Sequence, residues 1–340
     1  MLVNDFDYQL PPELIAQQPV EPRDRSRLLV LDRSKKVYSD RIFFELTSLL
    51  SPGDLLVFND TKVIPARLFA EKEGGSSRIE VFLLKHLSGS SWECLVRPGK
   101  RVKTGLKLHF EQGVTGEVLA TTPAGGRIIE FPKEINFREW LSRVGQTPLP
   151  PYITASLAEP DRYQTVYAHT EGSVAAPTAG LHFTEDLFKD LSRHHIKTGF
   201  LTLHVGLGTF RPVQTERIEE HLMHSEFFTL SSSLVEEIET TKKAGKKVIA
   251  VGTTVVRVLE SQADDNGRLK AGSGETAIFI YPGYKFKVVD ALITNFHLPR
   301  STLLMLVSAF AGRDFILESY AHAVKEQYRF FSFGDATIIL

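Results

Sequence analysis

The chain has 340 residues, about twice the roughly 150 residues of an average domain, so it has room for two domains and at least one sizeable core. Apolar residues make up 42% of the chain, and its 24 glycines bring that share into the range of soluble globular proteins, which excludes disorder as the main state. The 40 Lys and Arg against 41 Asp and Glu leave a formal net charge of -1, so any nucleic acid or membrane surface has to be bound by a local patch.

The lone cysteine and the length of the apolar runs indicate a cytoplasmic protein. Cys94 cannot form an internal disulfide, a four-thiolate zinc site or a cysteine-bound iron–sulfur cluster. The longest strongly apolar stretch, residues 303–311, is about half the length that a membrane-spanning helix needs. We therefore expect no membrane partner and a reducing compartment.

The first 69 residues have an α/β pattern. Pro12 opens a short helical stretch through residue 17. The apolar runs at 28–31 and 55–58 predict buried strands on either side of a helix over residues 40–50.

Residues 69–132 change to short strands separated by turn clusters such as Gly74-Gly75-Ser76-Ser77 and Gly125-Gly126. That spacing predicts a small antiparallel β-barrel. A short helix is expected over residues 136–144, and the prolines at 148, 150 and 151 mark a domain boundary.

The α/β pattern returns after residue 152. Helices are expected over residues 184–194, with Thr184 as N-cap, over 233–244, with Ser233 and Glu236 as a capping box and Gly245 at its end, and over 314–328. They alternate with predicted strands at 248–251, 276–280 and 288–294, the order of a layered sheet. The predicted fold is therefore an α/β main domain, residues 1–69 plus 151–340, interrupted by an inserted antiparallel β-barrel domain, residues 70–150.

Several common motifs are absent. Gly206 and Gly208 match the first two glycines of the Gly-x-Gly-x-x-Gly motif that binds dinucleotides. Arg211, however, occupies the position where that motif requires a third small residue. Neither a Walker lysine motif nor a Gly-x-Ser-x-Gly elbow occurs. These absences leave NAD binding, nucleotide hydrolysis and serine-esterase chemistry without support in the sequence.

Five polar clusters lie at the ends of predicted strands or the starts of predicted helices, where open α/β sheets bind ligands. They span residues 59–67, 176–184, 203–211, 252–257 and 294–302. The first four also have a structural interpretation: a solvated turn at 59–67, a hydrogen-bonding cap residue at His182, a core histidine at His204, and a strand-to-helix turn at 252–257.

Two further groups of side chains have two interpretations each. His221, His224 and Glu226 resemble scattered metal ligands, but on a helix Glu226 would point away from the two histidines, so acid–base or hydrogen-bonding use is favoured. A basic stripe without acidic residues, either a solvated face or a site for a phosphate backbone, consists of Arg97, Lys100, Arg101, Lys103 and Lys107.

Taken together, the order and spacing of the polar strings resemble one known family. The strings are residues 57–67, 176–184, 203–213, 223–226, 252–257, 294–312 and 328–335, and the resemblance extends over essentially the whole chain. They are similar to the S-adenosylmethionine:tRNA ribosyltransferase-isomerases of queuosine biosynthesis, apart from the ending Thr337-Ile338-Ile339-Leu340, where that family usually has Met-Leu-Ile.

The resemblance implies transfer and isomerisation of the ribosyl group of S-adenosylmethionine onto 7-aminomethyl-7-deazaguanine at the tRNA wobble position. Epoxyqueuosine forms, and adenine and methionine leave. It also implies an α/β domain with an inserted barrel, S-adenosylmethionine as a substrate, and no metal or radical cofactor. We expect a monomer whose partners are S-adenosylmethionine and precursor-bearing tRNA.

The expected chemistry assigns roles to residues in the polar clusters. A sulfonium acidifies its neighbouring carbon, so a base is required at the ribose 5′ proton, and adenine leaves more readily when protonated. Candidate proton-transfer residues are His182, His204, Glu226 and His297. Candidate substrate-binding residues are Asn59, Asp60, Lys62, Arg67, Thr178, Phe183, Phe210, Arg211, Thr253, Arg257, Asn295, Phe296 and Arg300. The basic stripe is the candidate tRNA-binding surface.

Two other classes of protein remain open from the residues alone. One is a tRNA-binding protein without chemistry, which would give no turnover. The other is a metal-dependent hydrolase that uses His221, His224 and Glu226 and would lose its activity when a chelator removes the metal.

Overall fold

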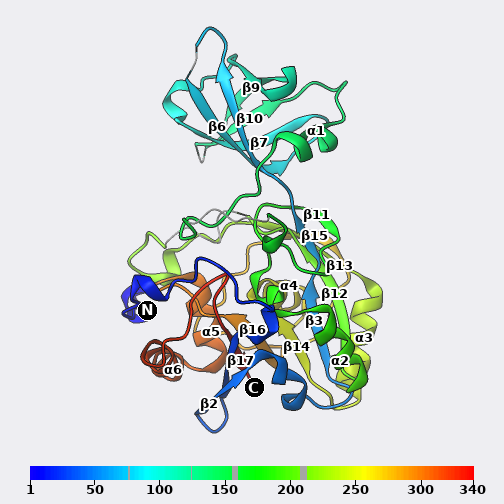
Figure 1. Ribbon diagram of the computed structural model, residues 1–340. Coiled ribbons are helices and arrows are strands. Elements are labelled where there is room, and N and C mark those ends of the chain that lie inside the picture. The colour runs from blue at the N-terminus through cyan, green and yellow to red at the C-terminus, as the bar shows by residue number, and fades with distance from the viewer. Residues whose placement is uncertain (76, 124, 155–159, 207–212) are drawn as a thin grey trace. The chain divides into compact units, whose positions relative to one another are not determined.

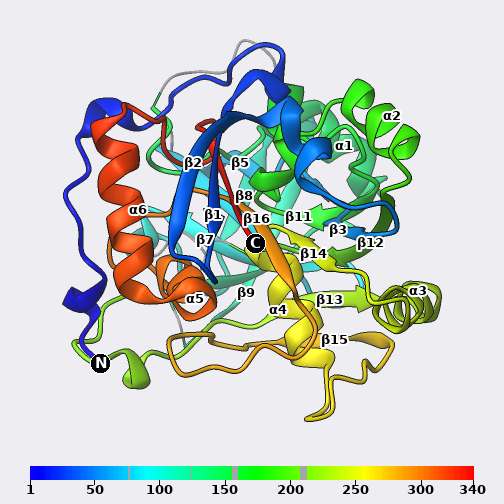
Figure 2. The same cartoon turned by 90° about the horizontal axis from the view of Figure 1, so that it is seen from below.

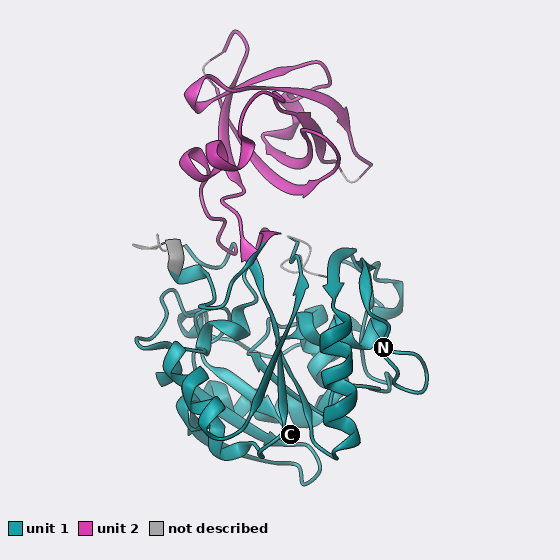
Figure 3. Ribbon diagram, turned by 90° about the vertical axis from the view of Figure 1, so that its right-hand side faces the viewer, with its two compact units in different colours: residues 1–61, 151–170, 176–340 teal, residues 62–150, 171–175 magenta. Residues whose placement is uncertain are grey.

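A computed structural model of the chain describes every residue except 76, 124, 155–159 and 207–212 (Figure 1). The chain folds into two compact units, coloured separately in Figure 3. Unit 1 comprises residues 1–61, 151–170 and 176–340, and unit 2 comprises residues 62–150 and 171–175. The predicted α/β fold with an inserted barrel is confirmed.

Unit 1 is built on a mixed nine-stranded sheet in the order β15-β13-β12-β3-β14-β16-β17-β1-β2. Its strands are β1 (Arg27–Asp32), β2 (Val37–Ile42), β3 (Leu55–Asn59), β12 (Lys197–Leu203), β13 (Glu226–Leu230), β14 (Val248–Val251), β15 (Gly272–Thr276), β16 (Ala291–Asn295) and β17 (Ala336–Ile339). The central strands β12, β3, β14 and β16 run parallel, so their carboxyl ends meet at one edge. The fully buried runs of β3, β14 and β16 are typical of strands covered on both faces.

Helices cover both faces of this sheet (Figure 2). The α-helices of unit 1 are α2 (Glu185–Arg193), α3 (Ser232–Lys243), α4 (Thr253–Gln262), α5 (Thr302–Ala311) and α6 (Arg313–Lys325). One face packs against α2 and two 3₁₀ helices, η4 (Phe43–Leu49) and η8 (Thr178–His182). Leu56 and Phe58 of β3 belong to that core, as the two-residue period of a strand requires, whereas Leu55 lies towards Leu234 of α3 on the other face.

Unit 2 contains a closed six-stranded antiparallel barrel in the order β10-β7-β6-β5-β8-β9. Its strands are β5 (Arg67–Lys72), β6 (Arg78–His86), β7 (Ser91–Arg97), β8 (Lys107–Phe110), β9 (Thr115–Thr121) and β10 (Arg127–Glu130), and α1 (Phe137–Val144) follows them. Alternating residues such as Ile79, Val81 and Leu83 of β6 are buried, which is how a small barrel fills its interior. Two short strands, β4 (Thr61–Val63) and β11 (Thr170–Ser173), pair with each other as a separate sheet.

Several predicted elements end elsewhere or are of another kind. The helix expected over residues 40–50 is wrong at its start, because residues 37–42 pair with β1 as strand β2 and only a 3₁₀ helix follows. The strand expected over residues 276–280 is wrong too. The glycine-rich segment before it forms β15 instead, since it pairs with β13, an example of tertiary context overriding propensity.

The remaining boundary differences are smaller. The stretch from Pro12 forms a single 3₁₀ turn that ends at Leu14. Helix α3 begins at Ser232 with Ser231 as its cap, because the Ser231 hydroxyl accepts from the Leu234 N–H, so the predicted Ser233 cap is wrong. Strand β16 covers residues 291–295 and not 288–294, and α6 ends at Lys325 and not at residue 328.

The predicted N-cap Thr184 is confirmed, because its Oγ1 accepts from the Leu187 N–H at 3.2 Å. Thr184→Ala is expected to lower the free energy of unfolding by about 0.5–2 kcal/mol, since the first turn of α2 loses its acceptor. Thr184→Ser, which keeps the hydroxyl, is the control and should cost less. Urea unfolding of the two variants measures the difference, and equal losses would contradict the capping role.

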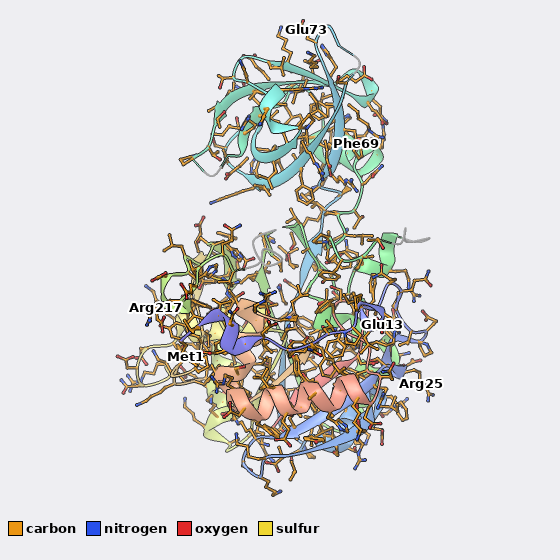
Figure 4. All side chains as sticks on the ribbon, turned by 90° about the vertical axis from the view of Figure 1, so that its left-hand side faces the viewer. Met1, Glu13, Arg25, Phe69, Glu73 and Arg217 are labelled. Carbon is orange, nitrogen blue, oxygen red and sulfur yellow. The ribbon has the colours of Figure 1, made fainter. Side chains whose placement is uncertain are left out.

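The N-terminal segment packs beside residues near Arg217, where Leu2 and Arg217 form an isolated antiparallel β-bridge (Figure 4).

Within the described part of the chain, none of the helices combines the length and the apolar character that crossing a bilayer requires.

Candidate active site

A pocket opens in unit 1 at the edge where the carboxyl ends of the parallel strands β12, β14 and β16 meet. Figure 1 shows these strands in the sheet, where β3 lies between β12 and β14. Four of the five predicted polar clusters line the pocket: Ala176 to Ala179, Val205, Gly252 to Thr254, and Thr294 to Leu298 with Ser301. Tyr152, Leu303, Phe331 and Ser332 complete the described lining. The sheet therefore brings together segments that are far apart in the sequence.

Asn295 links three parts of the pocket wall. Its Oδ1 accepts from Thr178 Oγ1 at 3.3 Å, and its Nδ2 donates to the Phe331 carbonyl at 3.0 Å. The same Nδ2 lies 3.1 Å from Nε2 of His182. Because an amide nitrogen only donates, Nε2 accepts, and Nδ1 of His182 donates to Ser26 Oγ at 2.7 Å. Asn295 thus acts as a fixed polar part of the wall.

His182 is fully buried behind that wall and is not among the lining residues. Its ring stacks on Phe43, with 4.9 Å between ring centroids. Burial, together with the nearby Arg23 guanidinium, holds the pKa of His182 well below its usual range. The structure therefore places a neutral imidazole here, with both ring nitrogens hydrogen-bonded.

His297 lines the pocket directly. Its Nε2 lies 3.1 Å from Thr294 Oγ1, and its carbonyl accepts from Tyr8 Oη at 2.5 Å. Burial lowers the pKa of His297 to about 3, so its imidazole is neutral at physiological pH. This histidine offers the pocket a hydrogen-bonding group without charge.

His204 follows β12 and is the most exposed of the four candidate proton-transfer residues. Its Nδ1 lies 2.8 Å from Thr61 Oγ1, and its ring stacks on Phe227 at 6.0 Å. Burial lowers the pKa of His204, and the Asp60 carboxylate partly opposes that shift.

Asn59 and Asp60 join β3 to β12 beside His204. The Asn59 side chain is fully buried and exchanges two hydrogen bonds with the backbone of Leu203, at 2.9 and 3.0 Å. Asp60 Oδ1 accepts from Thr202 Oγ1 at 2.6 Å. Both side chains hold the strand ends that carry His204, and Asn59 also reaches Thr254 of the pocket at 3.4 Å.

Glu226 forms a buried ion pair with Arg257, two residues that are 3% and 2% exposed. Glu226 Oε1 also accepts from the Gly206 N–H at 2.8 Å and lies 3.1 Å from His224 Nε2. Burial by itself would raise the pKa of Glu226, but His224, Arg257 and the Gly206 N–H together lower it to about 2. The carboxylate therefore stays ionised and holds the backbone at Gly206.

The three side chains of the metal-site hypothesis do not form a ligand group. His224 contacts Glu226, whereas His221 packs edge-on against Phe279 at 5.3 Å. His221 and His224 do not lie on a helix. No cluster of three potential ligands occurs within the residues that the structure describes.

Thr253 begins α4 at the pocket, and Gly252 before it adopts φ +96°, a conformation that favours glycine. Residues 252–254 at the start of this helix line the pocket, and the first N–H groups of a helix suit an anion or a sugar oxygen. Arg257, one turn further along α4, instead points its guanidinium to Glu226.

Of the remaining predicted residues, Phe296 lines the pocket, and the others lie away from it or outside the described residues. Phe183 is buried in the core against Phe43 and Phe58, and Phe296, although it lines the pocket, is 1% exposed. The exposed Arg300 lies 3.7 Å from Asp7. Within unit 2, Lys62 pairs with Glu171, Arg67 pairs with Glu80, and the five side chains of the basic stripe are exposed. Phe210 and Arg211 lie outside the described residues.

Sequence reasoning missed the wall formed by Tyr152, Phe331 and Ser332. Tyr152 Oη lies 2.7 Å from Ser332 Oγ, and the Tyr152 ring packs on Phe331 at 4.8 Å. Phe331 adopts φ +70°, which is rare for a residue with a side chain and marks a backbone conformation imposed by its surroundings. The string 328–335 contains Phe331 and Ser332 and resembles the family, but it gave neither residue a role in a site.

Comparisons with known proteins identify the family to which the chain belongs. The profile of the family described as "Queuosine biosynthesis protein" matches residues 3–339. The chain is 57% identical to the S-adenosylmethionine:tRNA ribosyltransferase-isomerases of Halothermothrix orenii and Moorella thermoacetica, over 100% of each chain. The crystal structure of S-adenosylmethionine tRNA ribosyltransferase from Thermotoga maritima, 42% identical, matches 99% of this chain and 100% of its own with a TM-score of 0.57. The chain therefore belongs to the queuosine biosynthesis protein family.

Proposed function

We propose that this protein is an S-adenosylmethionine:tRNA ribosyltransferase-isomerase. It transfers and isomerises the ribosyl group of S-adenosylmethionine onto 7-aminomethyl-7-deazaguanine at the tRNA wobble position, giving epoxyqueuosine, adenine and methionine. The observation that carries this proposal is the full-length identity of 57% to relatives of that name, in a chain whose matching segments converge on one pocket.

The pocket wall suits the uncharged part of a nucleoside. Thr178, Thr294, Asn295 and Ser301 present hydroxyl and amide groups, which hydrogen-bond to ribose hydroxyls and base edges. The start of α4 adds backbone N–H donors at the same edge. We assign this pocket to the ribosyl group and its attached base.

His204 is the proton-transfer residue that the geometry favours. A general base has to reach the ribose 5′ proton, whose removal starts the loss of adenine. His182, His297 and Glu226 are 0%, 6% and 3% exposed, whereas His204 is only half-buried. Glu226, with its pKa lowered to about 2, is a weak base and acts as a positioning residue for Gly206.

The reaction is tested by mixing the purified protein, S-adenosylmethionine and precursor-bearing tRNA, with and without chelator. We expect adenine and methionine to appear in equal amounts while the tRNA gains the mass of the ribosyl group, in both arms. Turnover lost in chelator would support a metal-dependent hydrolase, and RNA binding without turnover would support a binding protein. We propose that no metal or redox cofactor takes part, and that the protein acts as a monomer in the cytoplasm, where its tRNA substrate is found.

We further propose that the basic stripe of the barrel binds the phosphate backbone of the tRNA. The triple variant Lys100→Glu, Arg101→Glu and Lys103→Glu is expected to bind tRNA more weakly and with a smaller salt dependence, by about 0.7–0.9 in the slope for each phosphate that the variant no longer neutralises. Lys133→Glu, which changes an exposed lysine of the same unit outside the stripe, is the control. An unchanged affinity and salt slope in the triple variant would remove the stripe from the tRNA-binding surface.

A further inference from the structure

Three arginines from separate segments of unit 1 come together beside the pocket. Arg23 lies in η3 (Arg23–Arg25), Arg162 in η7 (Pro160–Tyr163), and Arg329 in the loop between α6 and β17. Arg162 pairs with Glu21, and Arg329 donates to the Gln18 carbonyl, so both are tied to the segment that carries Arg23. We call these three residues the arginine cluster.

Arg23 is the buried member of the cluster. Its Nε donates to the Leu181 carbonyl at 3.3 Å, and its Nη1 donates to the Phe333 carbonyl at 3.4 Å. Its Nη2 is buried and has no partner among the described residues. Burial and then the Arg329 charge, with a further contribution from Arg162, lower the pKa of Arg23 to about 10. The fold thus holds positive charges close together and leaves the Nη2 of Arg23 without an acceptor. Both features cost free energy, so a bound anion would explain them.

Glu21 and Asp335 offset the charge of the arginine cluster only in part, because the pKa of Arg23 is lowered in spite of both carboxylates. The Glu21 side chain is 65% exposed, so its pair with Arg162 is screened by solvent and is easily exchanged for another anion. Asp335 is 2% exposed, and its two carboxylate oxygens accept from the backbone N–H groups of Arg27 and Arg329, at 2.8 and 2.7 Å. Burial raises the pKa of Asp335, and the two backbone hydrogen bonds oppose that shift.

The arginine cluster borders the pocket through the backbone groups that Arg23 binds. Leu181 belongs to η8, the element that supplies Thr178 and Ala179 to the pocket. Phe333 directly follows Phe331 and Ser332 of the pocket wall. An anion bound by the cluster is therefore a neighbour of whatever occupies the pocket.

We propose that the arginine cluster binds a backbone phosphate of the tRNA next to the wobble nucleotide, whose base enters the pocket. The proposal rests on the proposed function, because that function makes RNA the source of the phosphate. Planar guanidinium groups bind phosphate oxygens in pairs, and Arg162 and Arg329 are partly exposed and supply those donors. Arg23 adds charge from within the fold, where screening is weak. This site is separate from the basic stripe, which lies in unit 2.

The test measures binding of a fluorescent anticodon stem–loop RNA at several salt concentrations. The protein variants are Arg162→Gln, Arg329→Gln and the two combined, and Arg193→Gln, an exposed arginine of α2, is the control with the same charge change. In the combined variant, the slope of log affinity against log salt is expected to fall by about 0.7, because the one bound phosphate is no longer neutralised. Thermal melting and binding of S-adenosylmethionine should remain as in the unchanged protein.

Distinct outcomes separate this proposal from the proposed function. Failure of the unchanged protein to release adenine with precursor-bearing tRNA would overturn the proposed function. Normal turnover of the unchanged protein, with equal salt slopes for the combined variant and Arg193→Gln, would overturn the arginine cluster alone. Competition by inorganic phosphate gives a further test at constant ionic strength. If phosphate displaces RNA only when Arg162 and Arg329 are present, that result supports the site.

If Arg193→Gln lowers the salt slope as much as the cluster variants do, the arginines contribute only non-specific charge, and the proposed site is wrong. If the combined variant unfolds at a lower temperature than the unchanged protein, the salt slope of Arg162→Gln alone decides between these outcomes. Arg162 pairs with the exposed Glu21, so its loss disturbs the fold least.

Discussion

Arg257→Leu is expected to lower the free energy of unfolding by about 3–5 kcal/mol at pH 7, because it leaves the Glu226 carboxylate buried without its cation. Glu226 is 3% exposed, and Arg257 reaches it from α4. Leucine fills much of the space that the arginine stem occupies, so the loss comes mainly from the unpaired charge. Urea unfolding followed by circular dichroism measures the change.

The pH dependence of the same variant provides an independent check. The folded-state pKa of Glu226 is lowered to about 2, so its stabilising contribution is fully present above the unfolded-state pKa, about 4.3, and is lost as the pH falls towards 2. Without Arg257, burial is opposed only by His224 and the Gly206 N–H, so the folded-state pKa of Glu226 rises. The deficit of Arg257→Leu should therefore shrink between pH 7 and pH 4.

The double variant Glu226→Gln and Arg257→Leu is the matched control. It removes both charges, so we expect it to recover a large part of the lost stability, although the Gly206 N–H then bonds to a neutral acceptor. A double variant that is less stable than Arg257→Leu would show that the carboxylate stabilises the fold without its arginine partner. That result would contradict the argument from the ion pair.

The sequence predicted the polar segments of the site but not the contacts between them. Thr294, Asn295 and Gly252 were identified because polar residues after buried strands collect at one edge of a parallel sheet, and the order of β14 and β16 brings them together. The pairing of Glu226 with Arg257 was not predicted, since it depends on α4 packing against β15, the strand that pairs with β13. Sequence spacing contains no information on such a contact.

Burial explains the other differences between sequence and structure. His182 and Phe183 belong to a polar string that matches the family, yet the turn of η8 directs both side chains into the core. Tyr152 and Ser332 reach the pocket from segments 180 residues apart. The barrel was predictable from its turn spacing, whereas β15 was not, because its Gly272 and Gly274 have low strand propensity and form a strand only through pairing with β13.

His204→Ala is expected to lower the rate constant for adenine release by about 10²–10⁴-fold, the usual contribution of a positioned general base. Binding of S-adenosylmethionine should change little, because His204 acts on a proton and the pocket wall carries the hydrogen bonds to the nucleoside. Single-turnover assays with saturating tRNA measure the rate of the chemical step. His194→Ala, which changes an exposed histidine at the end of α2, is the control.

The pH profile distinguishes a base from a residue that only packs. Burial lowers the pKa of His204 below 6.5, so its neutral, proton-accepting form predominates at pH 7 and activity should fall only as the pH drops below that value. Asp60 raises the pKa of His204, so Asp60→Asn should move this acidic limb to lower pH, whereas His204→Ala should abolish it. If His204→Ala releases adenine at the normal rate with the same acidic limb, the base is another residue, and Asp60, which lies beside the same strand end, is the next to replace.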